Sequence, residues 1–139
     1  MNREIKFRGK RLDNGEWAYG NLQQQAVKNE EWYITSITSP FNEFLNESHI
    51  IDPKTVGQYT GLKDKNGIDI YEGDIFHLGA PNITYTVVYF DTAFRGKQNG
   101  ASSYVGLDSR KDCIEVIGNI HESEVNDEKI WLYTSWFDY

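Results

Sequence analysis

The chain opens with EIKFRGKRLDNGEWAYG, residues 4–20, which predicts a β-hairpin. Apolar and charged side chains alternate around Ile5 and Phe7, and this period of two is typical of a half-buried strand. Asp13-Asn14-Gly15 then supplies residues that tolerate a positive φ, as tight hairpin turns require. The alternation resumes at Trp17 and Tyr19. We expect two strands here, near Glu4–Phe7 and Glu16–Leu22.

Beyond the hairpin, short runs of β-branched and aromatic residues predict further strands separated by turns. The expected strands are Glu31–Ile37, Thr55–Thr60, Ile75–Leu78, Thr84–Phe90, Ser103–Leu107 and Cys113–Ile117. Only Pro40–Ser48 and Glu122–Lys129 have room for a helical turn, and neither shows the apolar period of a helix. The spacing predicts an all-β fold, with an N-terminal hairpin region followed by a small SH3-like curled sheet or barrel.

The length and charge of the chain limit its organisation and its partners. Its 139 residues fit a single domain, which we divide into a hairpin region of about residues 1–50, a barrel-like core of about 51–121 and a tail of 122–139. The formal net charge of -7 repels phosphate backbones and disfavours general nucleic-acid binding.

The cysteine content and the hydropathy pattern indicate a cytoplasmic protein. The single cysteine, Cys113, forms no internal disulfide, and its place in an apolar run predicts an inert, packed thiol. The opening MNREIKFRGK lacks the apolar region of a secretory signal, and no apolar run approaches the ~20 residues that span a bilayer. We expect neither export by that route nor a membrane span.

Three segments resemble the YopX family of phage and prophage proteins. They are REIKFRGKRLDNGEWAYG at the start, VGQYTGLKDKNGIDIYEGDIF at Val56–Phe76, and VIGNIH near residue 120. The resemblance covers about residues 3–121, and the aromatic tail departs from the family pattern. It implies a β-rich fold with a small barrel-like core, a phage accessory role in a bacterial host cell, and no known catalytic residues.

The central motif itself has the composition of a scaffold. Asn66-Gly67 suits a tight turn, and the glycines at 57, 61 and 73 permit sharp bends. Asp74 is placed to accept hydrogen bonds from nearby backbone amides.

No pattern in the sequence indicates an enzyme. His49, His77, His121 and Cys113 are scattered without metal-ligand spacing, and no phosphate-binding loop or nucleophile elbow is present. The pair Glu72 and Asp74 shares one strand face, but paired acids are common in an acidic protein. We expect no catalytic residue, no metal and no cofactor.

One feature favours nucleic-acid binding, the alternative function. Lys6, Arg8 and Lys10 fall on the same face of the first strand, and small barrels can bind single strands through exposed aromatics. The competing interpretation is a solvated or edge-protecting strand, which the net charge favours. A hydrolase is a distant third possibility.

A protein-interaction role fits more of the sequence, because 4 Trp and 9 Tyr are many for a small core and aromatics are preferred interface anchors. We expect a non-enzymatic module that binds a phage or host protein, or a second copy of itself as a homo-oligomer. The candidate surface residues are Trp131, Tyr133, Trp136, Tyr59, Tyr71, Glu72 and Asp74. In the tail, Trp131 and Trp136 are expected to be substantially removed from water.

Overall fold

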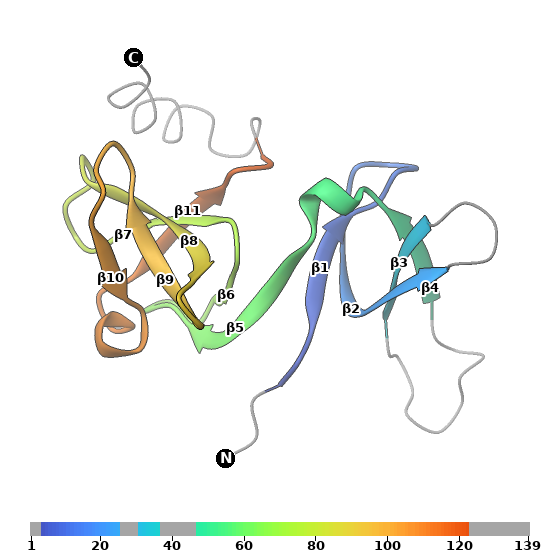
Figure 1. Cartoon of the computed structure of the whole chain (residues 1–139), viewed down its shortest axis with the longest axis horizontal. Helices are drawn as coiled ribbons and strands as arrows, with labels where there is room; N and C mark the ends of the chain where they lie inside the picture. Colours follow the sequence, from blue (N-terminus) through green and yellow to red (C-terminus); the bar gives the residue numbers. More distant parts are fainter. Residues whose placement is uncertain (1–3, 26–30, 37–46, 123–139) are drawn as a thin grey trace. The chain divides into compact units, whose positions relative to one another are not determined.

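Antiparallel β-strands form almost all of the regular structure in the computed structural model, which describes residues 4–25, 31–36 and 47–122 (Figure 1). The strands are β1 (Phe7–Lys10), β2 (Trp17–Gln25), β3 (Glu31–Ser36), β4 (Glu47–Ile51), β5 (Gly57–Lys63), β6 (Asp69–Tyr71), β7 (Asp74–His77), β8 (Thr84–Phe90), β9 (Ala93–Gln98), β10 (Tyr104–Gly106) and β11 (Glu115–Asn119). Two 3₁₀ turns, η2 (Pro53–Thr55) and η3 (Asp108–Arg110), are the only helical segments among the described residues. The all-β prediction is confirmed.

Two compact units divide the chain, with the boundary between Tyr59 and Thr60. β5 crosses this boundary, so its first residues belong to unit 1 and its last residues to unit 2. That the whole chain acts as a single domain stays a prediction.

Unit 1 is an antiparallel meander in which β1 lies between β2 and the start of β5, with β3 and β4 beyond β2. The predicted hairpin turn is confirmed: the Gly15 amide donates to the Arg11 carbonyl at 2.9 Å, and Gly15 has a φ of 73°. Arg11 also donates to Asp13 through Nε at 3.0 Å and Nη2 at 2.7 Å, which lowers the pKa of that carboxyl. Local residues therefore fix this turn.

The first strand begins later than its alternation predicts. Its ladder with β2 starts where Phe7 faces Gly20, because from Asn21 onward β2 pairs with β3 instead. Ile5 consequently stays outside the sheet and is 63% exposed, so its predicted half-buried position is wrong. The core of unit 1 is built from Ala18, Ile34 and Ile51.

Unit 2 contains a five-stranded antiparallel sheet in the order β10-β9-β8-β7-β11, while β6 pairs with β5. Of the two shapes predicted for this region, the closed barrel is wrong. In the described sheet β10 pairs with β9 and β11 pairs with β7, but β10 and β11 do not pair with each other, so the sheet stays open. β8 has the bounds that the sequence predicts.

The core of unit 2 depends on a glycine in β9, a strand that we did not predict. Phe76 and Val87 are fully buried on one face of the sheet. A Cβ added at Gly96 would lie 2.5 Å from Cζ of Phe76 and 3.0 Å from Cγ2 of Val105. Only a residue without a side chain fits here.

Cys113 does not pack as predicted. It is exposed and lies in the turn before β11, where its amide donates to the Arg110 carbonyl at 2.9 Å. The next residue, Ile114, takes the fully buried position instead.

We expect Gly96→Ala to lower the free energy of unfolding by about 1–3 kcal/mol, because the new methyl group overlaps the ring of Phe76. Urea denaturation measures the change. Gly106→Ala is the matched control, since its Cβ would meet nothing closer than 3.5 Å. Phe76→Leu makes room for the new methyl group, so the double variant should lose less stability than the sum of the losses of the two single variants. Equal stabilities of the two alanine variants would contradict this account of the core.

Candidate functional site

The outer face of β8, β9 and β10 carries a stacked pair of aromatic rings. The ring centroids of Phe90 and Tyr104 lie 4.6 Å apart, with an angle of 9° between the planes. Phe90 is 49% exposed and Tyr104 is 38% exposed. The pair therefore presents a large, rigid apolar area to water, of the kind that marks interaction sites.

Two cations share this face. Lys97 lies opposite Tyr104 in the ladder, and Arg95 is two residues from Lys97, so both point to the same side as the rings. Arg95 Nε donates to the Phe90 carbonyl at 3.0 Å, and Lys97 Nζ donates to the Ala101 carbonyl at 3.1 Å. Neither forms an ion pair with a carboxylate of the described residues. We call Phe90, Arg95, Lys97 and Tyr104 the aromatic–cationic face.

The turn that holds this face together is strained. Asp91 and Thr92 join β8 to β9 as a two-residue turn between the paired Phe90 and Ala93, and their φ values are 54° and 65°. A β-branched residue is rarely found in this left-handed region, whose steric penalty is about 1–2 kcal/mol. The Thr92 hydroxyl donates to the Asp91 carbonyl at 2.6 Å.

A second cluster of cations and rings lies within unit 1. Of the three predicted cations, Arg8 and Lys10 share one face of β1 and Lys6 directly precedes the strand. Each of the three sits over an aromatic ring. Lys6 Nζ is 4.7 Å from the centroid of Tyr59, Arg8 Cζ is 4.7 Å from that of Trp17, and Lys10 Nζ is 5.7 Å from the same Trp17 ring. These cation–π contacts cover the rings with the chain's own charges.

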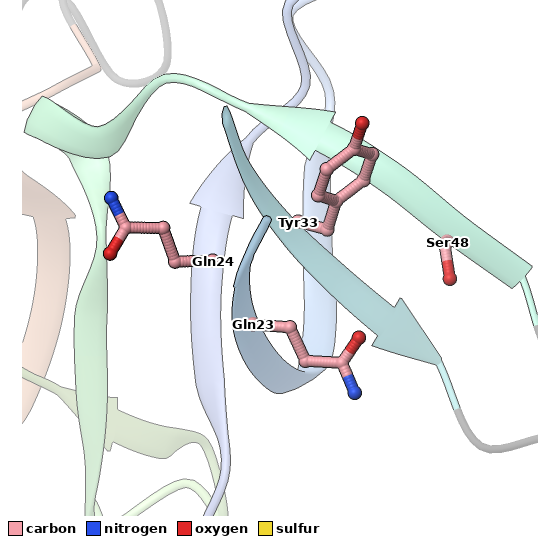
Figure 2. Close-up of a pocket in the computed structure, with 4 residues that line it drawn as sticks. All are labelled: Gln23, Gln24, Tyr33 and Ser48. Atoms are coloured by element: carbon pink, nitrogen blue, oxygen red, sulfur yellow. The ribbon is translucent and has the colours of Figure 1, made fainter. Parts of the chain in front are cut away.

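Unit 1 also has a surface hollow of about 660 Å³. Its described lining is Gln23, Gln24, Tyr33 and Ser48, and Figure 2 shows how these side chains project from their strands. Gln23 lies opposite Tyr33 in the ladder, whereas Gln24 points to the other face of β2. Amides and hydroxyls make up this described lining, and it includes no carboxylate or imidazole that could activate a hydroxyl as a general base.

Two of the three histidines, His77 and His49, lie beside carboxylates. His77 Nδ1 accepts a hydrogen bond from the Gly79 amide at 3.0 Å, and its Nε2 lies 3.9 Å from Glu115, which also pairs with Lys65 at 3.0 Å. His49 Nε2 lies 3.4 Å from a Glu47 oxygen. In the described parts of the chain, no three His, Cys, Asp or Glu side chains converge as a metal site would require.

Comparison with known proteins identifies the family. The YopX protein family matches residues 6–125. The chain belongs to the YopX family. The crystal structure of protein EF1440 from Enterococcus faecalis is similar, with a TM-score of 0.53 and 25% identity over 90% of this chain and 99% of that one. Curated proteins give no match.

In this YopX chain the central motif is a scaffold. The Asp64 carboxylate accepts hydrogen bonds from the amides of Asn66 at 2.8 Å, Ile68 at 2.9 Å and Val116 at 3.0 Å, which ties the Asp64–Gly67 turn to β11. Asp74 accepts from the Tyr71 amide at 2.7 Å, as predicted. These two carboxylates of the central motif thus have a structural use in this chain.

The candidate surface residues lie in different settings. Tyr59, Tyr71 and Asp74 are buried, and Glu72 is half-buried. The other three, Trp131, Tyr133 and Trp136, lie outside the described residues. The described part of the chain holds no helix long and apolar enough to cross a membrane.

The residues of the aromatic–cationic face were not predicted as a site. Phe90 and Tyr104 belong to separate predicted strands, and only the unpredicted β9 between them brings them together. The available signal was the alternation of Ala93, Arg95 and Lys97, which gives β9 one polar face.

We expect Thr92→Gly to raise the free energy of unfolding by about 0.5–1 kcal/mol, because the relief of backbone strain exceeds the added entropy of the unfolded chain. Asp91→Gly is the control and should gain less, since aspartate tolerates the left-handed region better. Urea denaturation of both variants measures the difference. A less stable Thr92→Gly protein would show that the turn is unstrained.

We expect Lys6, Arg8 and Lys10 not to support tight DNA binding, because their charges already contact the chain's own rings and the net charge is -7. A gel shift with single-stranded DNA at physiological salt should show no complex below about 1 μM. A sub-micromolar complex that is lost on replacing all three by Gln, in a variant that still melts cooperatively, would contradict this.

Proposed function

We propose that this YopX-family chain is a non-enzymatic accessory protein of a phage or prophage, which binds a protein partner in the bacterial cytoplasm. The observation that carries the proposal is the aromatic–cationic face, with its exposed stack of Phe90 and Tyr104. The phage setting is what the family resemblance implies, and no single residue carries it.

The composition of the face supports binding to a protein. Aromatic residues and arginine are enriched at the centres of protein interfaces, where rigid rings bury much area with little loss of side-chain entropy. Here the two rings already hold each other in place, so binding would order them little further. Their neighbours Arg95 and Lys97 supply polar groups at the margin of the apolar area.

The test compares retention of proteins by the immobilised full chain and its variants. We expect Phe90→Ser with Tyr104→Ser to weaken the capture of at least one specific protein by about 30-fold, as loss of an interface hot spot does. That protein is then purified, and its affinity for each variant is measured directly. Sedimentation of the chain alone shows whether the partner is a second copy.

Ile68→Ser is the matched control, because Ile68 is 53% exposed and lies in the turn between β5 and β6. The Ile68→Ser protein should bind as the unmodified chain does. Both this control and the double variant should melt cooperatively. The proposal fails if no protein, including a second copy, distinguishes the double variant from this control.

A further inference from the structure

The edge strand β10 leaves backbone groups directed away from the sheet. The Gln98 amide donates to the Ser103 carbonyl at 2.8 Å, which makes these two residues a hydrogen-bonded pair. In an antiparallel ladder such pairs alternate with non-bonded ones, so the N–H and C=O groups of Tyr104 and Gly106 point away from β9. Both residues are exposed, and β10 ends the sheet that the described strands form (Figure 1).

An extended peptide could pair with these groups. Adding a strand to an open edge satisfies the outward amides and carbonyls, and every second side chain of the added strand then falls beside Tyr104. Neighbouring strands lie about 4.8 Å apart, so such a side chain would touch the Phe90–Tyr104 stack. The edge gives backbone pairing, and the aromatic–cationic face gives side-chain contacts.

The local charge selects an acidic segment. Between Arg95 and Asp112 the chain has four cations, Arg95, Lys97, Arg110 and Lys111, against two carboxylates, Asp108 and Asp112, although its net charge is -7. None of the four cations forms an ion pair with a described carboxylate. Lys97 Nζ reaches the Ala101 carbonyl, which places this charge just before β10.

We propose that β10 binds an extended, acidic segment of a protein partner, which pairs with the backbone of Tyr104 and Gly106 and directs carboxylates to Lys97, Arg110 and Lys111. This inference rests on the proposed function and names the partner's chemistry. A second copy of β10 fits less well, because the same cations would face one another. A nucleic-acid strand also fits less well, because its negative phosphates would lie against the outward carbonyl oxygens of β10.

The test is fluorescence anisotropy with labelled peptides of about six residues, the usual length of a strand. The full chain should bind a peptide that alternates valine and glutamate at least about 10-fold more tightly than its glutamine counterpart, and should not bind the lysine counterpart. Added salt should weaken the binding. N-methylation of alternate peptide amides should abolish it, because pairing needs those donors.

Two pairs of variants locate the site. Gly106→Pro removes only an outward amide and should reduce affinity at least about 10-fold, whereas Gly106→Ala keeps that amide and should bind normally. Lys97→Gln should weaken the valine–glutamate peptide several-fold, whereas Lys54→Gln, a change at an exposed lysine of unit 1, should not. Cooperative melts of all four variants confirm that they fold.

Several outcomes would overturn this inference: no binding of the glutamate peptide at about 1 mM, equal binding of its glutamine or N-methylated forms, or tighter binding of an oligothymidine that Lys97→Gln weakens. The proposed function is judged separately by the Phe90 and Tyr104 variants. A partner lost by those variants but bound equally by Gly106→Pro and Gly106→Ala would leave the proposed function standing and refute the edge.

Discussion

The ring of Phe76 rests directly on the backbone of Gly96, and this contact decides which face of the five-stranded sheet is the core. Phe76 is fully buried, and no side chain fits at Gly96 beneath it. Successive strand residues point to opposite faces, so Arg95 and Lys97 on either side of Gly96 must point outward. The packing of the opposite face therefore sets the side of the sheet on which the two cations lie.

Local patterns explain why much of the fold was predictable. The alternation in Thr84–Phe90 and the turn residues Asp13–Gly15 act within a few residues of one another, and both predictions are confirmed. β9 was missed because its buried face offers Phe94, Gly96 and Gln98, in which the central residue has no side chain. The need for glycine becomes visible only when Phe76, twenty residues earlier in the chain, is placed against it.

The candidate sites show the same difference between local sequence patterns and contacts with distant segments. The common face of Lys6, Arg8 and Lys10 follows from the period of one strand, and the ladder between β1 and β2 agrees with it for Arg8 and Lys10. Exposure of an aromatic residue depends instead on distant segments. Tyr59 and Tyr71 lie in the family motif and are buried, whereas Phe90 and Tyr104 lie outside it and form the exposed stack.

The two groups of cations and rings differ in what they leave available to a ligand. In unit 1 the positive charges lie on the rings themselves, so these interactions are already made within the chain. In unit 2, Arg95 and Lys97 donate to neutral carbonyl groups and pair with no carboxylate of the described residues. A cationic donor attracts a carboxylate more strongly than a neutral carbonyl, because both partners then carry opposite full charges. An incoming carboxylate can thus replace the carbonyl on Lys97 with a net gain, while the adjacent stack keeps its outer ring surfaces for apolar contact. Arg95 and Lys97 are thus held in place without being neutralised by a carboxylate of the described residues, which leaves both charges available to an anionic partner.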